Sequence, residues 1–147
     1  MAAGMTLPRF SFEAPDSVGA ACSLLAQARG DARPMAGGTD LLVKMKAGLL
    51  APKAIVSLAR VPGLDAVKPS ADGGLRIGAL AAMATLAAHP TLRGPWAALA
   101  EGAGSVGGPI VRNRATVGGN IVSARPCADT APPLIALGAK LHLAGAT

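Results

Sequence analysis

The sequence predicts an α+β fold in two lobes, a small β-α-β-α-β lobe over residues 1–60 and a larger α+β lobe over residues 61–147. Two observations lead to this prediction. In the first sixty residues, short apolar runs alternate with stretches whose apolar residues recur at helical spacing. Beyond residue 60 a hairpin pattern is followed by several helical segments. A chain of 147 residues is long enough to bury a core of its own.

The first lobe begins with one strand and one helix. Residues 10–12 alternate apolar and polar side chains, which predicts a short strand. Apolar residues then follow at helical spacing over residues 18–28. Asp16 or Ser17 can cap this helix through its side-chain oxygen, and Gly30 is placed to end it.

The rest of the first lobe repeats the strand and helix and adds a third strand. Residues 33–36 are expected to form the second strand. Thr39 or Asp40 can cap the helix that follows, which Gly48 ends. The apolar run 54–58 suits a buried strand and completes the β-α-β-α-β pattern.

The second lobe is predicted to open with a hairpin, in which residues 64–67 pair with residues 75–78 around the polar turn 68–74. Helices are expected at residues 83–88, where a following proline stops the helix, and at residues 96–102. A further helix is expected at residues 128–137, and a strand begins at residue 140.

Two glycine pairs, Gly37-Gly38 and Gly118-Gly119, carry the main functional signal. Each lies between an apolar residue and a polar one. Adjacent glycines let a ligand approach the main chain, and their successive N–H groups can form a concavity for phosphate oxygens. Two such turns suit a ligand with two phosphates. Glycine makes up 19 of the 147 residues, so an ordinary tight turn stays the alternative for either pair.

A third glycine pattern, over residues 102–107, has the G-x-G-x-x-G spacing of dinucleotide-binding folds. That fingerprint requires a strand before it and a helix after it. Here a helix is expected before it and Pro109 follows, so the match is interpreted as accidental.

Several motifs in order carry a more specific signal: Ala-Gly-Gly-Thr-Asp-Leu-Leu at 36–42, Gly-Leu-Arg-Ile-Gly-Ala at 74–79, and Ile-Val-Arg-Asn-Arg-Ala-Thr-Val-Gly-Gly-Asn at 110–120. Ala-Asp at 128–129, Pro-Pro-Leu at 132–134 and Leu-Gly-Ala at 137–139 continue the series. In these motifs the chain resembles the FAD-binding medium subunit of the molybdenum hydroxylases, the family of xanthine dehydrogenase, carbon monoxide dehydrogenase and 4-hydroxybenzoyl-CoA reductase. The resemblance implies a two-lobed, PCMH-type FAD-binding fold. Family members run to nearly twice this length, so the chain is expected to lack their C-terminal domain and to be incomplete in its second lobe.

The resemblance also implies an FAD site. Both glycine pairs would hold the pyrophosphate, Thr39 would hydrogen-bond beside it, and Asp129 would bind ribityl or ribose hydroxyls. The side chain of Val106 would pack near the cofactor. The cofactor-binding residues implied in this way are Arg33, Pro34, Met35, Ala36, Gly37, Gly38, Thr39, Asp40, Val106, Thr116, Val117, Gly118, Gly119, Asn120 and Asp129.

Three charged residues have simpler interpretations beside these. Asp129, taken alone, is an acid at the start of a helix. Arg112 and Arg114 would share one face of an extended segment. There they could contact phosphates or a partner subunit, or serve only solubility.

The sequence offers no nucleophile–base pair, metal-ligand cluster or P-loop lysine, so any chemistry would belong to a cofactor. The resemblance implies an electron-transfer subunit that passes electrons from iron–sulfur centres through FAD to NAD⁺, oxygen or a quinone. Cys22 and Cys127 are too few to ligate a cluster, so the iron–sulfur and molybdenum-cofactor subunits are expected to be other chains. Both cysteines are expected to have packing roles. The alternatives are a stand-alone PCMH-type flavoprotein oxidase and a truncated, non-catalytic scaffold.

Charge and composition exclude other classes of partner. The net charge is +6, but no block of consecutive Lys or Arg occurs and aromatic residues are scarce, which argues against nucleic acid. The sequence shows neither a secretory signal nor an apolar run of the roughly 20 residues that a membrane span needs. The chain is therefore predicted to be cytoplasmic.

Overall fold

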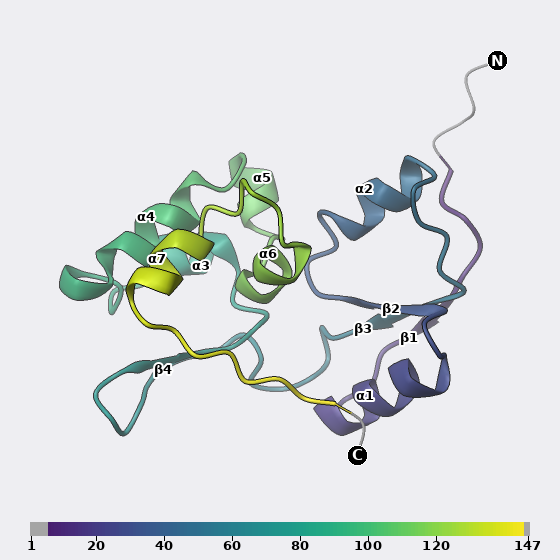
Figure 1. The fold of residues 1–147 in the computed structure, drawn as a ribbon, viewed down its shortest axis with the longest axis horizontal. Helices are drawn as coiled ribbons and strands as arrows, with labels where there is room; N and C mark the ends of the chain where they lie inside the picture. The colour runs from purple at the N-terminus through teal and green to yellow at the C-terminus, as the bar shows by residue number, and fades with distance from the viewer. Residues whose placement is uncertain (1–5, 146–147) are drawn as a thin grey trace. The chain divides into compact units, whose positions relative to one another are not determined.

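A computed structural model describes residues 6–145, which form two compact units (Figure 1). One unit comprises the described residues of 1–62 and 143–147, and the other comprises residues 63–142. No helix within the described residues is long and apolar enough to cross a membrane.

The first unit has the predicted β-α-β-α-β order, which is confirmed. Its three strands form one parallel sheet in the order β1-β3-β2. The elements are β1 (Ser11–Glu13), α1 (Val18–Gln27), β2 (Ala32–Met35), α2 (Leu41–Lys46) and β3 (Ala54–Ser57).

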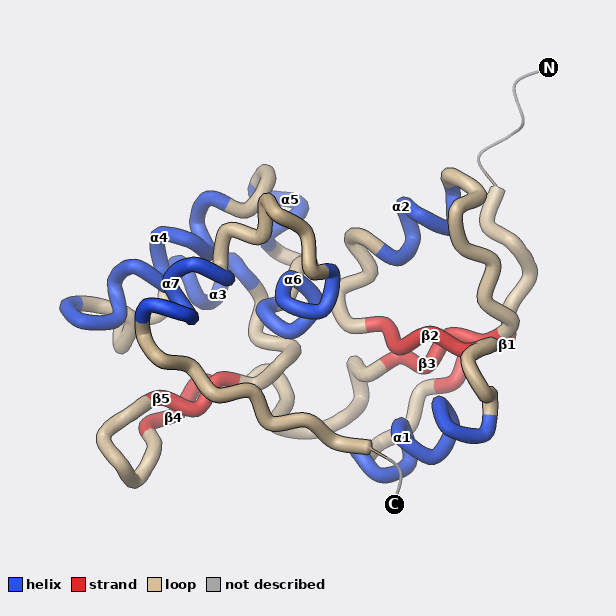
Figure 2. Tube along the Cα trace, in the orientation of Figure 1, coloured by secondary structure: helices blue, strands red, loops and turns tan. Residues whose placement is uncertain are grey.

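The strand order places the two helices on opposite faces of this sheet. The chain passes from β1 through α1 to β2, the far edge strand, and then returns through α2 to the central strand β3. These two crossovers run in opposite directions across the sheet. Because both are right-handed, their helices cover opposite faces. Figures 1 and 2 show α1 on one side of the strands and α2 on the other. Val56 packs in the cluster beneath α1, and its neighbour Ile55, also buried, points to the other face.

Of the four helix ends in the first unit, three have the cap or end residue that the sequence predicts. Of the two predicted caps of α1, Ser17 is the one used, since its hydroxyl accepts from the N–H of Ala20 at 3.2 Å. Gly30, with φ +95°, and Gly48, with φ +72°, follow the two helices as expected. Asp40 is the N-cap residue of α2 but makes no side-chain cap hydrogen bond, so the expected side-chain cap of this helix was wrong.

The second unit joins one hairpin to a group of helices (Figure 2). Its buried core is formed by residues from the helices and their connections, among them Met83, Leu86, Leu92, Leu99 and Ala103. The elements are β4 (Val67–Pro69), β5 (Leu75–Ile77), α3 (Met83–Ala88), the 3₁₀ helix η1 (Gly94–Trp96), α4 (Ala97–Ser105), α5 (Pro109–Arg112), α6 (Val117–Ser123) and α7 (Ala131–Ala136).

Three predictions for this unit need correction. The first hairpin strand is β4, later than the predicted 64–67, because the turn after Pro62 continues to residue 65. The helix expected at 128–137 begins only at Ala131, where proline in the first turn suits a helix start. The strand expected from residue 140 is absent from the described residues, in which 139–145 are irregular.

Candidate functional site

The first glycine pair lies in a loop between β2 and α2. Gly38 has φ +77°, a backbone conformation that side chains disfavour. A Cβ built there would lie 3.3 Å from Cδ1 of Leu42 and 3.4 Å from the sulfur of Met35. The positive φ therefore favours glycine at position 38, and a side chain there would also need Leu42 or Met35 to shift by a few tenths of an ångström.

Within the part of the chain that the structure describes, this loop leaves a row of backbone donors without partners. The N–H groups of residues 36–39 make no hydrogen bond to any other described residue. Residues 36–39 are all partly buried. Thr39 adds a hydroxyl that also has no partner among the described residues. Successive unpartnered N–H groups around a left-handed residue form a concavity that favours an anion.

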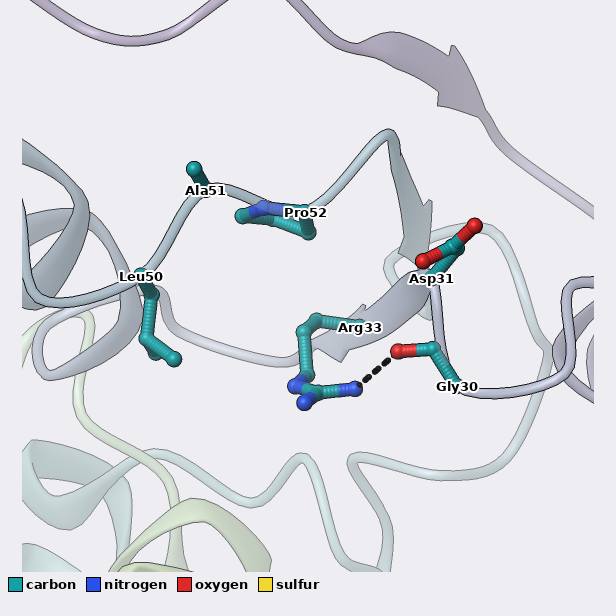
Figure 3. A pocket seen from close by; sticks show the side chains of 6 residues that line it. All are labelled: Gly30, Asp31, Arg33, Leu50, Ala51 and Pro52. Carbon is teal, nitrogen blue, oxygen red and sulfur yellow. Dashed lines mark hydrogen bonds between the residues drawn. The ribbon is translucent and has the colours of Figure 1, made fainter.

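Arg33 is not brought to this loop. Its Nη1 donates to the carbonyl oxygen of Gly30 at 2.7 Å and to that of Ala32 at 3.0 Å, at the opposite end of β2 from the glycine pair. Figure 3 shows the guanidinium turned toward Gly30. It lines a small pocket of about 220 Å³ together with Gly30, Asp31, Leu50, Ala51 and Pro52. Pro34, the next residue, is exposed.

The second glycine pair does not form a tight turn, so that expectation was wrong. Thr116 is the N-cap residue of α6, and its hydroxyl accepts from the N–H of Gly119 at 3.2 Å. Gly118 and Gly119 therefore lie in the first turn of a helix. A hydroxyl at the N-cap position stabilises this arrangement.

The N–H groups at this helix start are all used within the protein. Val117 donates to the carbonyl oxygen of Ala81 at 3.0 Å, and Gly118 donates to that of Ala79 at 2.9 Å. Gly119 and Asn120 both donate to Thr116, to its hydroxyl and its carbonyl oxygen respectively. Unlike the first pair, the second pair does not offer the expected concavity of N–H groups.

Gly118 instead permits a close approach of the main chain. A Cβ built at this position would lie 2.7 Å from both the Cβ and the carbonyl oxygen of Ala79. Distances below 3.0 Å essentially never occur for real Cβ atoms. The segment at Ala79 can therefore contact α6 only because residue 118 has no side chain.

The donors that remain at the second motif are side-chain groups. Asn120 is partly buried, and its Oδ1 accepts from the hydroxyl of Thr130, which leaves the Nδ2 group of Asn120. The hydroxyl proton of Thr116 is also left over, because among the described residues its oxygen acts only as the acceptor from the N–H of Gly119. Asp129, next to Thr130, is exposed. The structure thus brings Thr116, Asn120 and Asp129 to one part of the second unit.

The remaining predicted residue of this unit, Val106, is buried in the core cluster. Arg112 and Arg114 do not share an extended face, so that expectation was wrong. Pro109 begins the short helix α5, and Nη1 of Arg112 donates to the carbonyl oxygen of Gly107 at 2.7 Å. Arg112 therefore holds the α5 turn.

Two residues that sequence reasoning missed lie against this motif. Thr130 is fully buried and binds Asn120. A Cβ built at Gly102 of α4 would lie 2.6 Å from the carbonyl oxygen of Asp129, so this glycine admits the Asp129 segment. As expected, residues 102–107 lack the strand–turn–helix context of a dinucleotide fingerprint, since Gly102 lies within a helix.

The chemistry of these residues is that of binding. Within residues 6–145, no three His, Cys, Asp or Glu side chains gather to hold a metal ion. Cys127 is an exposed free thiol, so its expected packing role was wrong, and Cys22 is partly buried.

The comparisons with known proteins agree on one family. Residues 8–147 match the family described as the FAD binding domain in molybdopterin dehydrogenase. The carbon monoxide dehydrogenase medium chain of Hydrogenophaga pseudoflava is 36% identical over 96% of this chain and 49% of its own length. The putative xanthine dehydrogenase FAD-binding subunit of Escherichia coli is 35% identical over 76% of this chain and 38% of its own length. The reconstituted CO dehydrogenase from Oligotropha carboxidovorans superposes with a TM-score of 0.79 at 29% identity, over 85% of this chain and 44% of that one.

The chain therefore belongs to the family of FAD-binding domains of molybdopterin dehydrogenases. The predicted family and the predicted α+β fold class are confirmed. The chain spans about half the length of the curated relatives it matches.

Proposed function

We propose that this chain binds FAD and serves in the electron-transfer subunit of a molybdenum hydroxylase. The observation that carries the proposal is the row of unpartnered N–H groups at residues 36–39, in a chain that belongs to an FAD-binding family. Such a row suits the doubly charged pyrophosphate of FAD. When bound, FAD supplies the redox chemistry, and the protein binds and orients it.

The two glycine motifs have different roles in this proposal. Ala36, Gly37, Gly38 and Thr39 would hold the pyrophosphate through backbone N–H groups and the Thr39 hydroxyl. The second motif would act through side chains, with Asn120 and Thr116 as donors and Asp129 as acceptor for hydroxyl groups. The residues that would shape rather than contact the site are Pro34, Met35, Asp40, Val106, Val117, Gly118 and Gly119. Arg33, whose guanidinium lies at the other end of β2, would take no part in it.

The proposal extends to partners and location. Iron–sulfur and molybdenum-cofactor subunits on other chains would deliver electrons to the FAD, and NAD⁺, oxygen or a quinone would accept them. The names of the relatives, a medium chain and an FAD-binding subunit, support an assembly of this kind. A cytoplasmic location is proposed with it. Iron and molybdenum that co-purify with the chain from its native cell would support the complex, and their absence from a flavin-loaded preparation would contradict it.

The cofactor is tested with the purified chain and a pair of glycine variants. The chain is titrated with FAD and then gel-filtered, and retained flavin absorbance is the expected result. Gly38→Ala and Gly48→Ala introduce the same side chain at a positive φ in the same unit, with φ +77° and +72°. Both should lose stability, Gly38→Ala somewhat more because its Cβ would also lie 3.3 Å from Leu42, but only Gly38→Ala should weaken FAD binding. A colourless wild-type chain at saturating FAD, or equal affinity in both variants, would contradict the proposal.

A further inference from the structure

Thr130 is a buried polar residue with one partner. It lies between Asp129 and the start of α7, and its side chain is 0% exposed. Its hydroxyl donates to Oδ1 of Asn120 on α6. A buried hydroxyl proton needs an acceptor, and among the described residues this amide oxygen is the acceptor that Thr130 has.

This bond sets the orientation of the Asn120 side chain. An amide has an acceptor oxygen on one side and a donor NH₂ on the other. If the amide were rotated by half a turn, NH₂ would face the Thr130 hydroxyl and the buried proton would lose its acceptor. Leaving a buried polar group unsatisfied is unfavourable. Thr130 therefore holds Oδ1 inward and directs Nδ2 away from itself.

The Nδ2 group held in this way is accessible. It makes no hydrogen bond to another described residue. Within residues 6–145, no buried side-chain nitrogen or oxygen lacks a partner, so Nδ2 is not buried. The four backbone N–H groups at the start of α6 are already used inside the protein. A ligand at this helix start would therefore meet Nδ2 of Asn120 as a fixed donor.

We infer that Thr130 is a positioning residue for the cofactor, which acts by presenting Nδ2 of Asn120 as a hydrogen-bond donor to FAD. The inference rests on the proposed FAD binding and adds a residue to it. Thr130 would not touch the cofactor itself, since its side chain is fully buried.

The same bond also restrains Asp129, the residue before Thr130. The carbonyl oxygen of Asp129 lies close against Gly102 of α4, where a Cβ would come within 2.6 Å of it. Thr130 is hydrogen-bonded to α6, and the Asp129 main chain packs on α4. The main chain from which the exposed Asp129 carboxylate extends is therefore held in place.

The test measures FAD affinity by titration of the purified full chain, with the melting temperature followed in parallel. Thr130→Val keeps the volume and removes the hydroxyl, while Thr130→Ser keeps the hydroxyl. Loss of one well-placed hydrogen bond corresponds to about five- to tenfold in affinity, which is the weakening expected for Thr130→Val. Thr130→Ser should bind FAD within about twofold of the wild type, because it keeps the hydroxyl that holds Oδ1 of Asn120.

A double-mutant cycle separates positioning from a merely structural role. In an Asn120→Ala background no Nδ2 group remains to be oriented, so adding Thr130→Val should not weaken FAD binding further. A further loss in that background would overturn the inference, as would wild-type affinity in Thr130→Val. In either case FAD binding by the wild-type chain would leave the proposed function standing. A wild-type chain that binds no FAD would overturn both.

A second variant decides the matter if Thr130→Val does not fold. Asn120→Asp keeps an acceptor for the Thr130 hydroxyl and removes the Nδ2 donor. It is expected to weaken FAD binding by about tenfold or more, because a donor is lost and a negative charge is added against an anionic ligand. Wild-type affinity in this variant would overturn the inference.

Discussion

Gly118→Ala should destabilise the second unit, although alanine is the better helix former. Gly118 lies in the first turn of α6, where a Cβ would come within 2.7 Å of the Cβ and the carbonyl oxygen of Ala79. Both neighbours in that contact are rigid, one being backbone and the other a Cβ. The helix and the Ala79 segment must therefore move apart, and the hydrogen bond from Gly118 N–H to Ala79, 2.9 Å long, would be strained or lost.

The expected change in the free energy of unfolding follows from two destabilising contributions and one stabilising contribution. Overpacking a close contact costs about 1–3 kcal/mol. Losing the hydrogen bond costs about 0.5–1.5 kcal/mol. Replacing glycine in a helix gains up to about 1 kcal/mol. The lost hydrogen bond and the gain in helix propensity roughly cancel, which leaves the steric contribution. Gly118→Ala should therefore lower the free energy of unfolding by about 1–3 kcal/mol.

Gly104 of α4 provides the matched control in the same unit. A Cβ there would lie 3.8 Å from the Cβ of Ala87, an ordinary van der Waals contact. Gly104→Ala should therefore be neutral or stabilise the unit by up to about 1 kcal/mol. Gly19 of α1, in the other unit, shows that the same local sequence does not by itself require glycine. Like Gly118 it follows a hydroxyl N-cap residue and a valine, but nothing lies within 4 Å of its Cβ position.

The assay is urea unfolding followed by the fluorescence of Trp96. This is the single tryptophan of the chain and it packs against the core of the second unit. With a slope of about 1 kcal/mol per M urea, Gly118→Ala should lower the midpoint by about 1–3 M. An unchanged midpoint for Gly118→Ala, or equal shifts for the two variants, would refute the steric argument.

Three further predictions concern packing and charge. Gly102→Ala should lower both the stability of the second unit and the affinity for FAD, since its Cβ would lie 2.6 Å from the carbonyl oxygen of Asp129. FAD titration of this variant and of Gly104→Ala checks the prediction, and equal affinity in the two variants would contradict it. Met45→Ala, at a side chain 1% exposed, should cost about 2–5 kcal/mol by circular dichroism melting. Val43→Ala in the same helix, 61% exposed, should cost under about 0.5 kcal/mol, so similar losses would count against the assigned burial. The N–H of Gly74 donates to the Asp72 carboxylate at 3.0 Å and lowers the pKa of Asp72 from 3.8. The hydrogen bond therefore contributes to folding stability above pH 3.8, and this contribution is lost as the pH falls through the lowered pKa. An NMR titration midpoint for Asp72 at or above 3.8 would contradict this prediction.

Local patterns were sufficient where each element is determined by its own residues. The apolar runs of the first unit became parallel strands, and the expected helix at 83–88 is α3. Glycines placed after helices took positive φ, as at Gly30 and Gly48. In these cases the period of the apolar residues and the backbone freedom of glycine decide the structure without reference to distant segments.

Patterns failed where a distant partner selects between two local conformations. A hydroxyl, a valine and two glycines at 116–119 suit a tight turn or a capped helix start equally well. The helix is selected by Ala79 and Ala81, whose carbonyl oxygens accept from Gly118 and Val117. The extended segment expected at Arg112 and Arg114 was wrong for a local reason instead, because Pro109 begins α5 and Arg112 bonds to the carbonyl oxygen of Gly107, five residues before it. Thr130 had no local signal because its role depends on Asn120.

The two glycine pairs show that one motif can meet two physical requirements. At Gly38 the requirement is a backbone conformation, and the N–H groups around it stay available to a ligand. At Gly118 the requirement is space, and the N–H groups are used to bind the neighbouring segment. The second motif can therefore contribute to FAD binding only through the side chains that its helix presents. Asn120→Asp, which keeps an acceptor for the buried Thr130 hydroxyl, should consequently affect affinity more than the fold, whereas substitutions of Gly118 should affect the fold first.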